Sequence, residues 1–276
     1  MKKDIKLISL DLDGTLLDSK KRLSSRNEKA LKDCIARGIH IVPTTGRTVD
    51  GVPSVIKEIP GVRYAIATNG AIIYDMKEQK VIDSRMLDHD RALDILRMLE
   101  PYPVMFDPYI NGRGISEERF LNHMDEFGLT KELQDMVRIT RDVVPNIIRH
   151  VEETKCPIEK INIFFKEAAL KEQIREILKG FSGLIITSSI PLNLEINNLE
   201  ATKGKGILRL ASYLGISRNQ TMAFGDGEND MSMIEEAGIG VVMENGIESL
   251  KKKADYITKS NDEDGVAAGI EKFILT

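Results

Sequence analysis

Cysteine is scarce in this 276-residue sequence, in which only Cys34 and Cys156 occur, far apart and without a neighbour in a CxxC pair. This spacing argues against a disulfide framework and against a zinc site. An excess of positive charge is also lacking, because the 39 basic residues are outnumbered by 43 acidic ones, which gives a formal net charge of -4. No basic field is available to gather nucleic acid or anionic lipid, so we expect no nucleic-acid or membrane partner.

Long apolar runs are missing as well. The sequence has no apolar stretch of the roughly 18 residues that a membrane span needs. The apolar run near the N-terminus is broken by Asp11 and Asp13, so it lacks the apolar region of a signal peptide. Neither an internal repeat nor a low-complexity linker is present. These absences, together with the few cysteines, lead us to expect a globular protein of the reducing cytoplasm.

The order of the predicted elements indicates an α/β fold. Residues 5–10 form a short apolar run that stops at acids, as a buried parallel strand does. A helix follows, with Ser25 and Glu28 in a capping-box pattern and Gly38 as its stop signal. Further along the chain we expect a strand at 39–42, a loosely helical segment at 48–58 and a strand at 64–67. This alternation predicts a parallel sheet with a binding crevice at the carboxyl ends of its strands.

The rhythm changes after residue 70. Residues 71–85 have a hairpin pattern, and a helix pattern at 88–99 and a strand pattern at 161–165 then mix without regular alternation. Strands and helices alternate again from Lys203, with expected elements at 203–214, 221–224, 230–236 and 239–242. The sequence therefore predicts a Rossmann-like parallel-sheet core of residues 1–84 and 191–276, interrupted by an inserted α+β cap domain of residues 85–190.

Four polar clusters follow the predicted core strands or open a core helix. Two are acidic turns, residues 11–15 and 225–230, which contain the carboxylates Asp11, Asp13, Asp226 and Asp230. The other two offer hydroxyl, backbone N–H and cationic groups, and they are Thr44-Thr45-Gly46-Arg47 and Lys203-Gly204. Because the carboxyl ends of parallel strands meet at one edge of a sheet, we expect these clusters to line one crevice.

The chemistry of the clusters points to phosphate. Acids with no His or Cys beside them favour a hard cation such as magnesium, and N–H and ammonium donors at a helix start favour an anion. Taken singly, each cluster has a simpler interpretation, such as an Asp-Gly turn, a capping Thr45 or a solvated Lys203. Four clusters in this order at strand ends and helix starts favour the phosphate interpretation.

Other chemistries fit less well. Leu16 and Met231 occupy the positions at which an EF-hand calcium loop needs glycine. A cysteine phosphatase needs an Arg at a fixed distance after its nucleophile, but His40 and Asn162 stand there. The four histidines show no metal-ligand spacing. We therefore expect carboxylate chemistry.

At these clusters the chain resembles the haloacid dehalogenase-like hydrolase superfamily, and in particular its Cof-type phosphatases, whose type IIB cap is inserted after the second motif. The four motifs correspond to DLDGTLL at residues 11–17, TTGR at 44–47, Lys203-Gly204, and GDGENDMSM at 225–233. Asn69-Gly70 is similar to the family's TNGA segment. Pro43 is unexpected in the second strand and suits the end of a strand better than its middle.

The resemblance implies a role for each motif residue. Asp11 would be the nucleophile that becomes phospho-aspartate, and Asp13 would act as general acid and base. Magnesium would lie against Asp11, the backbone carbonyl of Asp13 and Asp226, with Asp230 and Arg47 supporting the site from outside. The phosphate oxygens would be held by the backbone at Leu12 and by Thr45, Gly46, Lys203 and Asn229.

The leading function is magnesium-dependent hydrolysis of small phosphorylated metabolites, with sugar phosphates as the expected class. A phosphomutase of the same superfamily, which passes the phosphoryl group to a sugar hydroxyl, is an alternative that the motifs leave open. A phospho-aspartate switch resembling a receiver domain is a further alternative. The insertion and Asp13 argue against the switch, because a switch gains nothing from a general acid that speeds loss of its phosphate.

Overall fold

The protein consists of two compact units. The computed structural model describes residues 4–275. One unit contains the described residues up to Ser84 and from Ala201, and the other is Arg85–Glu200. This discontinuous arrangement is the expected α/β core with an inserted, sheet-containing domain. The predicted boundary at 190 and 191 lies inside the inserted unit, because Asn193–Asn198 forms a strand of that unit's sheet.

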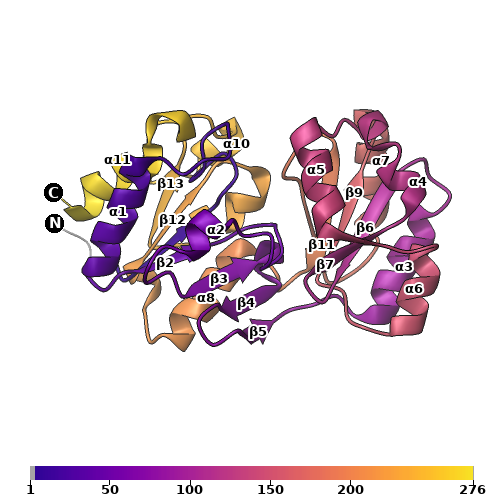
Figure 1. The fold of residues 1–276 in the computed structure, drawn as a ribbon, viewed down its shortest axis with the longest axis horizontal. Coiled ribbons are helices and arrows are strands. Elements are labelled where there is room, and N and C mark those ends of the chain that lie inside the picture. Colours follow the sequence, from indigo (N-terminus) through magenta and orange to yellow (C-terminus); the bar gives the residue numbers. More distant parts are fainter. Residues whose placement is uncertain (1–3, 276) are drawn as a thin grey trace. The chain divides into compact units, whose positions relative to one another are not determined.

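The core unit is built on a five-stranded sheet with the order β14-β13-β12-β1-β2. Figure 1 labels β13, β12 and β2 of this sheet. All of its neighbouring strands pair in parallel. The strands are short and, except for the edge strand β14, mostly buried, as expected for a parallel sheet covered on both faces. The strands are β1 (Leu7–Leu10), β2 (His40–Pro43), β12 (Thr221–Gly225), β13 (Ile239–Val242) and β14 (Tyr256–Ile257).

Alternating side chains of these strands feed two apolar layers. Ile8 and Leu10 pack in a cluster with residues of α1 (Ser25–Ala36) and α11 (Gly265–Ile270). Leu7 points to the opposite cluster, which contains residues of α8 (Lys203–Tyr213) and α9 (Met231–Glu236). The core sheet is thus sandwiched between helices, and its carboxyl edge is left to the loops that carry the polar clusters.

The predicted core elements occur with small shifts, with one exception. The N-cap of α1 is Ser24 rather than Ser25, and its side chain accepts a hydrogen bond from the Asn27 N–H group. Pro43 is the last residue of β2, which is an edge strand, so its missing N–H group interrupts no ladder. The helical expectation for 48–58 is wrong over most of its length, because Pro53 restricts α2 to Ser54–Lys57.

The expectation that the third strand, at 64–67, joins the parallel sheet is wrong, because this strand pairs antiparallel with β4 in a separate sheet of the core unit. β3 (Tyr64–Ala67), β4 (Ile72–Asp75) and β5 (Lys80–Ser84) follow one another in that sheet, so the hairpin expected at 71–85 is confirmed. A single parallel bridge joins Thr44, just after β2, to Ile66 in β3. The 3-10 turn η1 (Thr68–Gly70) connects β3 to β4. The remaining short elements of the unit are η3 (Arg218–Gln220), η4 (Glu228–Asp230), α10 (Glu248–Lys251), η5 (Asn261–Glu263) and η6 (Glu271–Leu275).

The inserted unit has a six-stranded sheet of its own, with the order β10-β11-β9-β6-β7-β8. All neighbours pair antiparallel except β7 and β8, which are parallel. The strands are β6 (Met105–Ile110), β7 (Arg113–Ser116), β8 (Arg141–Val143), β9 (Lys160–Phe164), β10 (Leu184–Thr187) and β11 (Asn193–Asn198). The helices are α3 (His89–Leu99), α4 (Glu118–Leu121), η2 (Met124–Phe127), α5 (Lys131–Thr140), α6 (Ile147–Thr154) and α7 (Ala168–Leu178). A single apolar cluster, which includes Leu96, Phe106, Ile163 and Ile174, forms the core of this unit.

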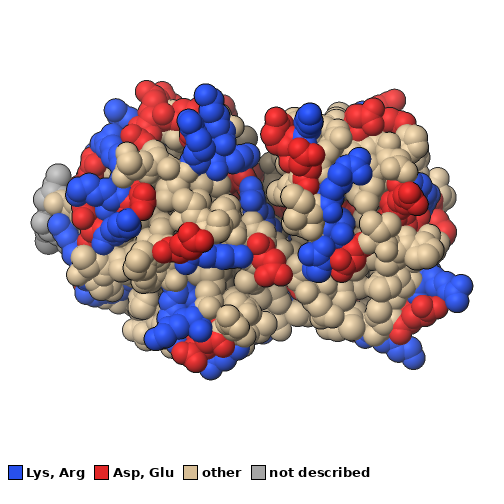
Figure 2. Space-filling view, in the orientation of Figure 1, with Lys and Arg blue, Asp and Glu red and all other residues tan. Residues whose placement is uncertain are grey.

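Charge is mixed over the surface. On the face drawn in Figure 2, basic and acidic side chains are interspersed on each unit. This distribution agrees with the near balance of 39 basic and 43 acidic residues in the sequence. Among the helices described within residues 4–275, none has the length and apolar character needed to cross a membrane.

Candidate active site

The acidic residues meet because of the register of the central strands. β1 pairs with β12 so that Leu10 lies opposite Phe224, and Asp11 and Asp226 follow within two residues of these partners. Gly14 allows the two loops to approach, since it has a φ of +85° and a Cβ atom there would lie 2.4 Å from Asp226 Oδ2. The parallel sheet therefore brings together carboxylates that are 215 positions apart in the sequence (226 minus 11).

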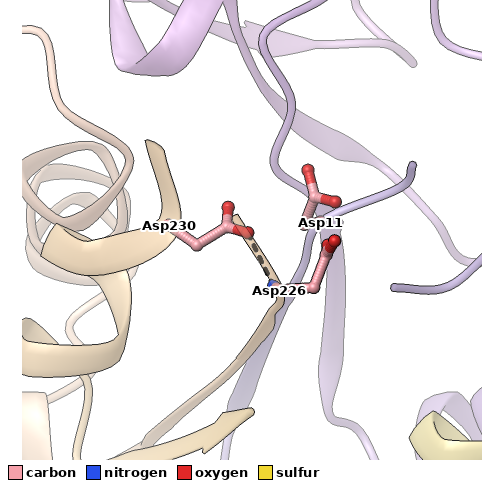
Figure 3. Close-up of side chains that lie close together, drawn as sticks. All are labelled: Asp11, Asp226 and Asp230. Carbon is pink, nitrogen blue, oxygen red and sulfur yellow. Dashed lines mark hydrogen bonds between the residues drawn. The ribbon is translucent and has the colours of Figure 1, made fainter. Parts of the chain in front are cut away.

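Three carboxylates form a compact cluster. Asp11, Asp226 and Asp230 each offer an oxygen that lies within 4.8 Å of the others (Figure 3). Asp11 and Asp230 are buried, and Asp226 is partly buried. The Nζ atom of the fully buried Lys203 lies 2.6 Å from Asp11 Oδ1 and 2.6 Å from Asp230 Oδ1. One ammonium group thus links the first motif to the fourth.

The oxygens of Asp230 are already occupied. Its Oδ1 atom accepts from Lys203, and its Oδ2 atom accepts from the N–H groups of Asp226 and Gly227, each at 2.8 Å. The bond to Asp226 N–H is the dashed line in Figure 3. Asp11 Oδ2, by contrast, accepts no hydrogen bond from the residues that the structure describes. Asp226 Oδ1 accepts from Thr15 Oγ1 at 2.6 Å. Asp11 and Asp226 are therefore better placed than Asp230 to ligate a cation.

The electrostatics of the cluster call for a divalent cation. Burial, followed by the neighbouring carboxylates of Asp230 and Asp226, raises the pKa of Asp11 well above its ordinary value despite the pull of Lys203. Burial and Asp230 raise the pKa of Asp226 to about 6. Three carboxylates facing one ammonium group leave two negative charges uncompensated. Oxygen ligands carrying this excess charge fit a divalent metal ion.

The Asp13 side chain is not part of the three-carboxylate cluster and is paired with two cations. Its carboxylate accepts two hydrogen bonds from Arg47, at 2.8 Å from Nε and 2.7 Å from Nη2, and one from Lys21 Nζ at 2.7 Å. Burial alone acts to raise the pKa of Asp13, but Arg47 and Lys21 outweigh it and hold that pKa below its usual range. The structure therefore places Arg47 against the expected general acid rather than against the three-acid cluster.

The second motif is held by backbone hydrogen bonds. The Thr45 hydroxyl accepts from the Arg47 N–H group at 3.1 Å, which is the local turn arrangement. The Thr45 N–H group donates to Ile66 O at 2.9 Å. Thr45 is buried and Gly46 is partly buried. Leu12 is also buried, and its carbonyl accepts from Leu17 N–H at 2.9 Å.

Lys203 and Asn229 reach the site from a helix and a turn. Lys203 is the first residue of α8, whose N-cap Thr202 accepts from Lys205 N–H at 3.1 Å. Burial acts against the Lys203 ammonium group, but Asp11 and Asp230 outweigh it and raise the pKa of Lys203 above its ordinary value. Asn229, in η4, donates from Nδ2 to Asn69 Oδ1 at 3.4 Å. The third motif thus contacts Asp11 of the first motif, and Asn229 of the fourth motif contacts the turn after β3.

The structure adds residues to which the sequence analysis assigned no role. Thr15 binds Asp226 and Lys21 binds Asp13. Thr15 lies inside the first motif and could have been suspected from its position alone. Lys21 could not have been suspected from the sequence. Its own backbone is left-handed, with a φ of 59°, and this conformation turns the loop back toward Asp13.

Comparisons with known proteins agree with this geometry. A family model described as haloacid dehalogenase-like hydrolase matches residues 8–270. The chain is 35% identical over 281 aligned residues to the phosphatase YwpJ of Bacillus subtilis, covering 95% of this chain and 98% of the relative. It is 30% identical over 276 residues to the 5-amino-6-(5-phospho-D-ribitylamino)uracil phosphatase YcsE of the same organism, covering 99% and 97%.

A solved structure has the same fold over the whole chain. It is a haloacid dehalogenase-like hydrolase from B. subtilis, with a TM-score of 0.87 and 31% sequence identity, and the match covers 98% of this chain and 100% of that one. The similarity therefore includes the inserted unit as well as the core.

Proposed function

Since the chain belongs to the haloacid dehalogenase-like hydrolase family and is a phosphatase like its full-length relatives, we propose that it hydrolyses small phosphomonoesters through a phospho-aspartate on Asp11. The observation that carries this proposal is the buried cluster of Asp11, Asp226 and Asp230 around Lys203. Such a cluster is costly to bury unless it serves a ligand, because its negative charge exceeds what one lysine can balance.

Asp11 is the nucleophile in this proposal. Lys203 holds its Oδ1 atom, which fixes the carboxylate plane and leaves Oδ2 for attack on phosphorus or for a cation. The Asp11 oxygen forms a bond to phosphorus while the bond between phosphorus and the leaving oxygen breaks. Water then attacks the phosphorus of the acyl phosphate, which releases inorganic phosphate and restores the carboxylate.

Asp13 moves the protons. It gives a proton to the leaving oxygen in the first step and takes one from the attacking water in the second. In the described arrangement its carboxylate is held by Arg47 and Lys21. Proton donation therefore requires Asp13 to loosen these ion pairs, so the two cations control when the acid is available. This extends the supporting role expected for Arg47.

We propose that the cation is magnesium and that Asp11, Asp226 and the backbone carbonyl of Asp13 hold it. The donor set fits, since it consists of hard oxygen ligands in a buried site with excess negative charge. When bound, magnesium would neutralise charge on the phosphoryl oxygens. Asp230 would support the site from behind, because Lys203 and two N–H groups already occupy its oxygens.

The phosphate oxygens would meet the backbone at Leu12 together with Thr45, Gly46, Lys203 and Asn229. None of these groups is suited to distinguish one leaving group from another. We therefore propose that the inserted unit Arg85–Glu200 acts as a cap that selects the substrate. The substrate would be a phosphorylated metabolite with a sugar or polyol portion, as the name of the YcsE relative indicates for that enzyme.

The test is an Asp11→Asn variant, assayed with magnesium against a panel of phosphorylated metabolites and an aryl phosphate. The amide has nearly the shape of the carboxylate but cannot attack phosphorus, so turnover should be abolished while the fold is kept. Asp33→Asn, at an exposed ion pair with Lys29, is the matched control and should behave as wild type. Substantial steady-state hydrolysis by Asp11→Asn would remove the covalent mechanism. Phosphoryl transfer to a sugar hydroxyl without release of phosphate would favour the phosphomutase.

A further inference from the structure

The turn between β3 and β4 has an unusual backbone. Thr68, Asn69 and Gly70 lie consecutively at positive φ, with values of 48°, 58° and 97°. Glycine accepts such angles freely and asparagine tolerates them, but a β-branched threonine rarely adopts them. All three residues are buried. A strained conformation of this kind persists only where surrounding contacts hold it, and such positions cluster at functional sites.

The contacts that hold the turn come from the second motif. Thr68 N–H donates to Arg47 O at 2.8 Å, and Asn69 N–H donates to Thr45 O at 3.0 Å. Thr45 N–H returns a bond to Ile66 O at 2.9 Å, just before the turn. The turn and the second motif are therefore locked together through their backbones, whatever side chains they carry.

The same turn also abuts the third motif. A Cβ atom on Gly70 would lie 2.2 Å from the carbonyl oxygen of Thr202, the N-cap of α8, so only glycine permits this approach. Arg209, further along α8, donates from Nη2 to Gly70 O at 2.5 Å and pairs with Asp83 through Nε at 2.6 Å. These contacts thus fix the position of the start of α8, which carries Lys203, relative to the turn.

The remaining link is to the fourth motif, through the hydrogen bond from Asn229 Nδ2 to Asn69 Oδ1. A carboxamide has one end that donates and one that accepts. In the structure Asn229 turns its NH₂ group toward the Asn69 Oδ1 acceptor, and the second hydrogen of that group remains for another acceptor. The opposite rotamer would place two amide oxygens against each other and present an acceptor to any anion.

We propose that Asn69 is a positioning residue, which fixes the amide of Asn229 so that its NH₂ group faces the phosphate. The proposal rests on the function proposed above, in which Asn229 contacts the phosphoryl oxygens. It assigns the strained turn a role: the left-handed backbone of Thr68 and Asn69, held by the second motif, aims the Asn69 side chain at the fourth. One turn then sets the relative positions of three phosphate-binding motifs.

The experiment is a double-mutant cycle with Asn69→Gly and Asn229→Ala in the full chain. Glycine keeps the positive φ of the turn without strain and removes only the carboxamide, so a loss of function reports the side chain. We expect kcat/KM for an aryl phosphate to fall about tenfold in each single variant. If Asn69 acts through Asn229, the double variant should lie within about twofold of Asn229→Ala alone. Asn111→Gly replaces another left-handed asparagine, at φ 50° in the inserted unit, and is the matched control.

A second measurement does not depend on turnover. Inorganic phosphate with magnesium should raise the melting temperature of wild type and of Asn111→Gly, and should raise that of Asn69→Gly much less. Fully additive losses in the cycle, or unchanged phosphate stabilisation in Asn69→Gly, would overturn the positioning role. If wild type hydrolyses no phosphomonoester but phosphate still stabilises it in an Asn69-dependent way, the proposed function fails and the positioning role stands. If phosphate does not stabilise wild type, the positioning role is overturned as well.

Discussion

Replacing Asp226 by asparagine should stabilise the metal-free protein, although it removes a proposed metal ligand. Burial and Asp230 raise the pKa of Asp226 from 3.8 to about 6. The folded protein therefore holds this proton more tightly than the unfolded chain, and ionising the group costs stability. The cost is absent below pH 3.8, grows as the pH rises, and is complete above pH 6. Asparagine, which carries no charge, avoids it.

The size of the effect follows from the pKa shift. A displacement of about two units corresponds to about 3 kcal/mol at pH 8. Because Asp226 is only partly buried and shares its field with Asp11 and Asp230, we expect about 1–2 kcal/mol to be measured. Asparagine Oδ1 can still accept from Thr15 Oγ1, so that contact, 2.6 Å in the native protein, need not be lost. At pH 4.5 only about a third of the gain should remain.

The assay is urea or thermal denaturation in EDTA at pH 8 and pH 4.5. Asp226→Asn should unfold at a higher temperature than wild type at pH 8, by roughly 2–4 °C per kcal/mol. Magnesium should narrow or reverse the difference, because wild type gains a ligand that the variant has lost. Asp33→Asn, at an exposed ion pair, should show neither effect. A destabilised Asp226→Asn protein at pH 8 in EDTA would show that the carboxylates are not in electrostatic conflict, and the argument for a cation site would lose its basis.

Three further predictions concern the neighbours of this cluster. Lys21→Gln removes a cation from Asp13, so the pKa of Asp13 should rise and the alkaline limb of the pH profile of kcat/KM should move to higher pH. An unmoved limb would show that Lys21 does not affect the ionisation of the general acid. Gly70→Ala should cost more than about 2 kcal/mol in urea unfolding, because its Cβ atom would lie 2.2 Å from Thr202 O. Gly38→Ala, also at positive φ but with nothing within 4 Å, should cost less, and equal costs would contradict the packing argument. Replacing Arg85–Glu200 by a Gly/Ser linker should leave a folded core that cleaves an aryl phosphate slowly, with its ranking of natural substrates lost; a retained ranking would place selectivity in the core.

The core was largely predictable because its signals are local. Short apolar runs ending in acids gave β1 and β12, and the parallel sheet then required Asp11 and Asp226 to share an edge. The C-terminal boundary of the insertion was less accessible. Residues 191–200 carry a strand pattern that suits either unit, and only the pairing of β11 with β9 and β10 assigns it to the inserted sheet.

The partners of the site side chains could not be read from the motifs. Asp13 and Asp11 are two residues apart, yet one is paired with Arg47 and Lys21 and the other with Lys203. That separation depends on the turn at Gly14, which a sequence pattern marks but does not orient. The left-handed backbone of Thr68 could not be predicted either, because threonine rarely adopts a positive φ and its presence does not indicate one.

The site is held together by close backbone approaches and by side chains that share partners, and both kinds of contact limit which substitutions it can accept. The spacing of the motifs is set by backbone approaches at Gly14 and Gly70, where any side chain would collide with Asp226 or Thr202. The chemistry is set by side chains that share partners, as Asp11 and Asp230 share Lys203. A substitution at either level disturbs several groups at once, because each partner serves more than one motif. The core therefore has little freedom to adapt to a new leaving group. We expect a change of substrate to be achieved more readily in the inserted unit, whose sheet and apolar core are separate from the residues proposed to hold the phosphate.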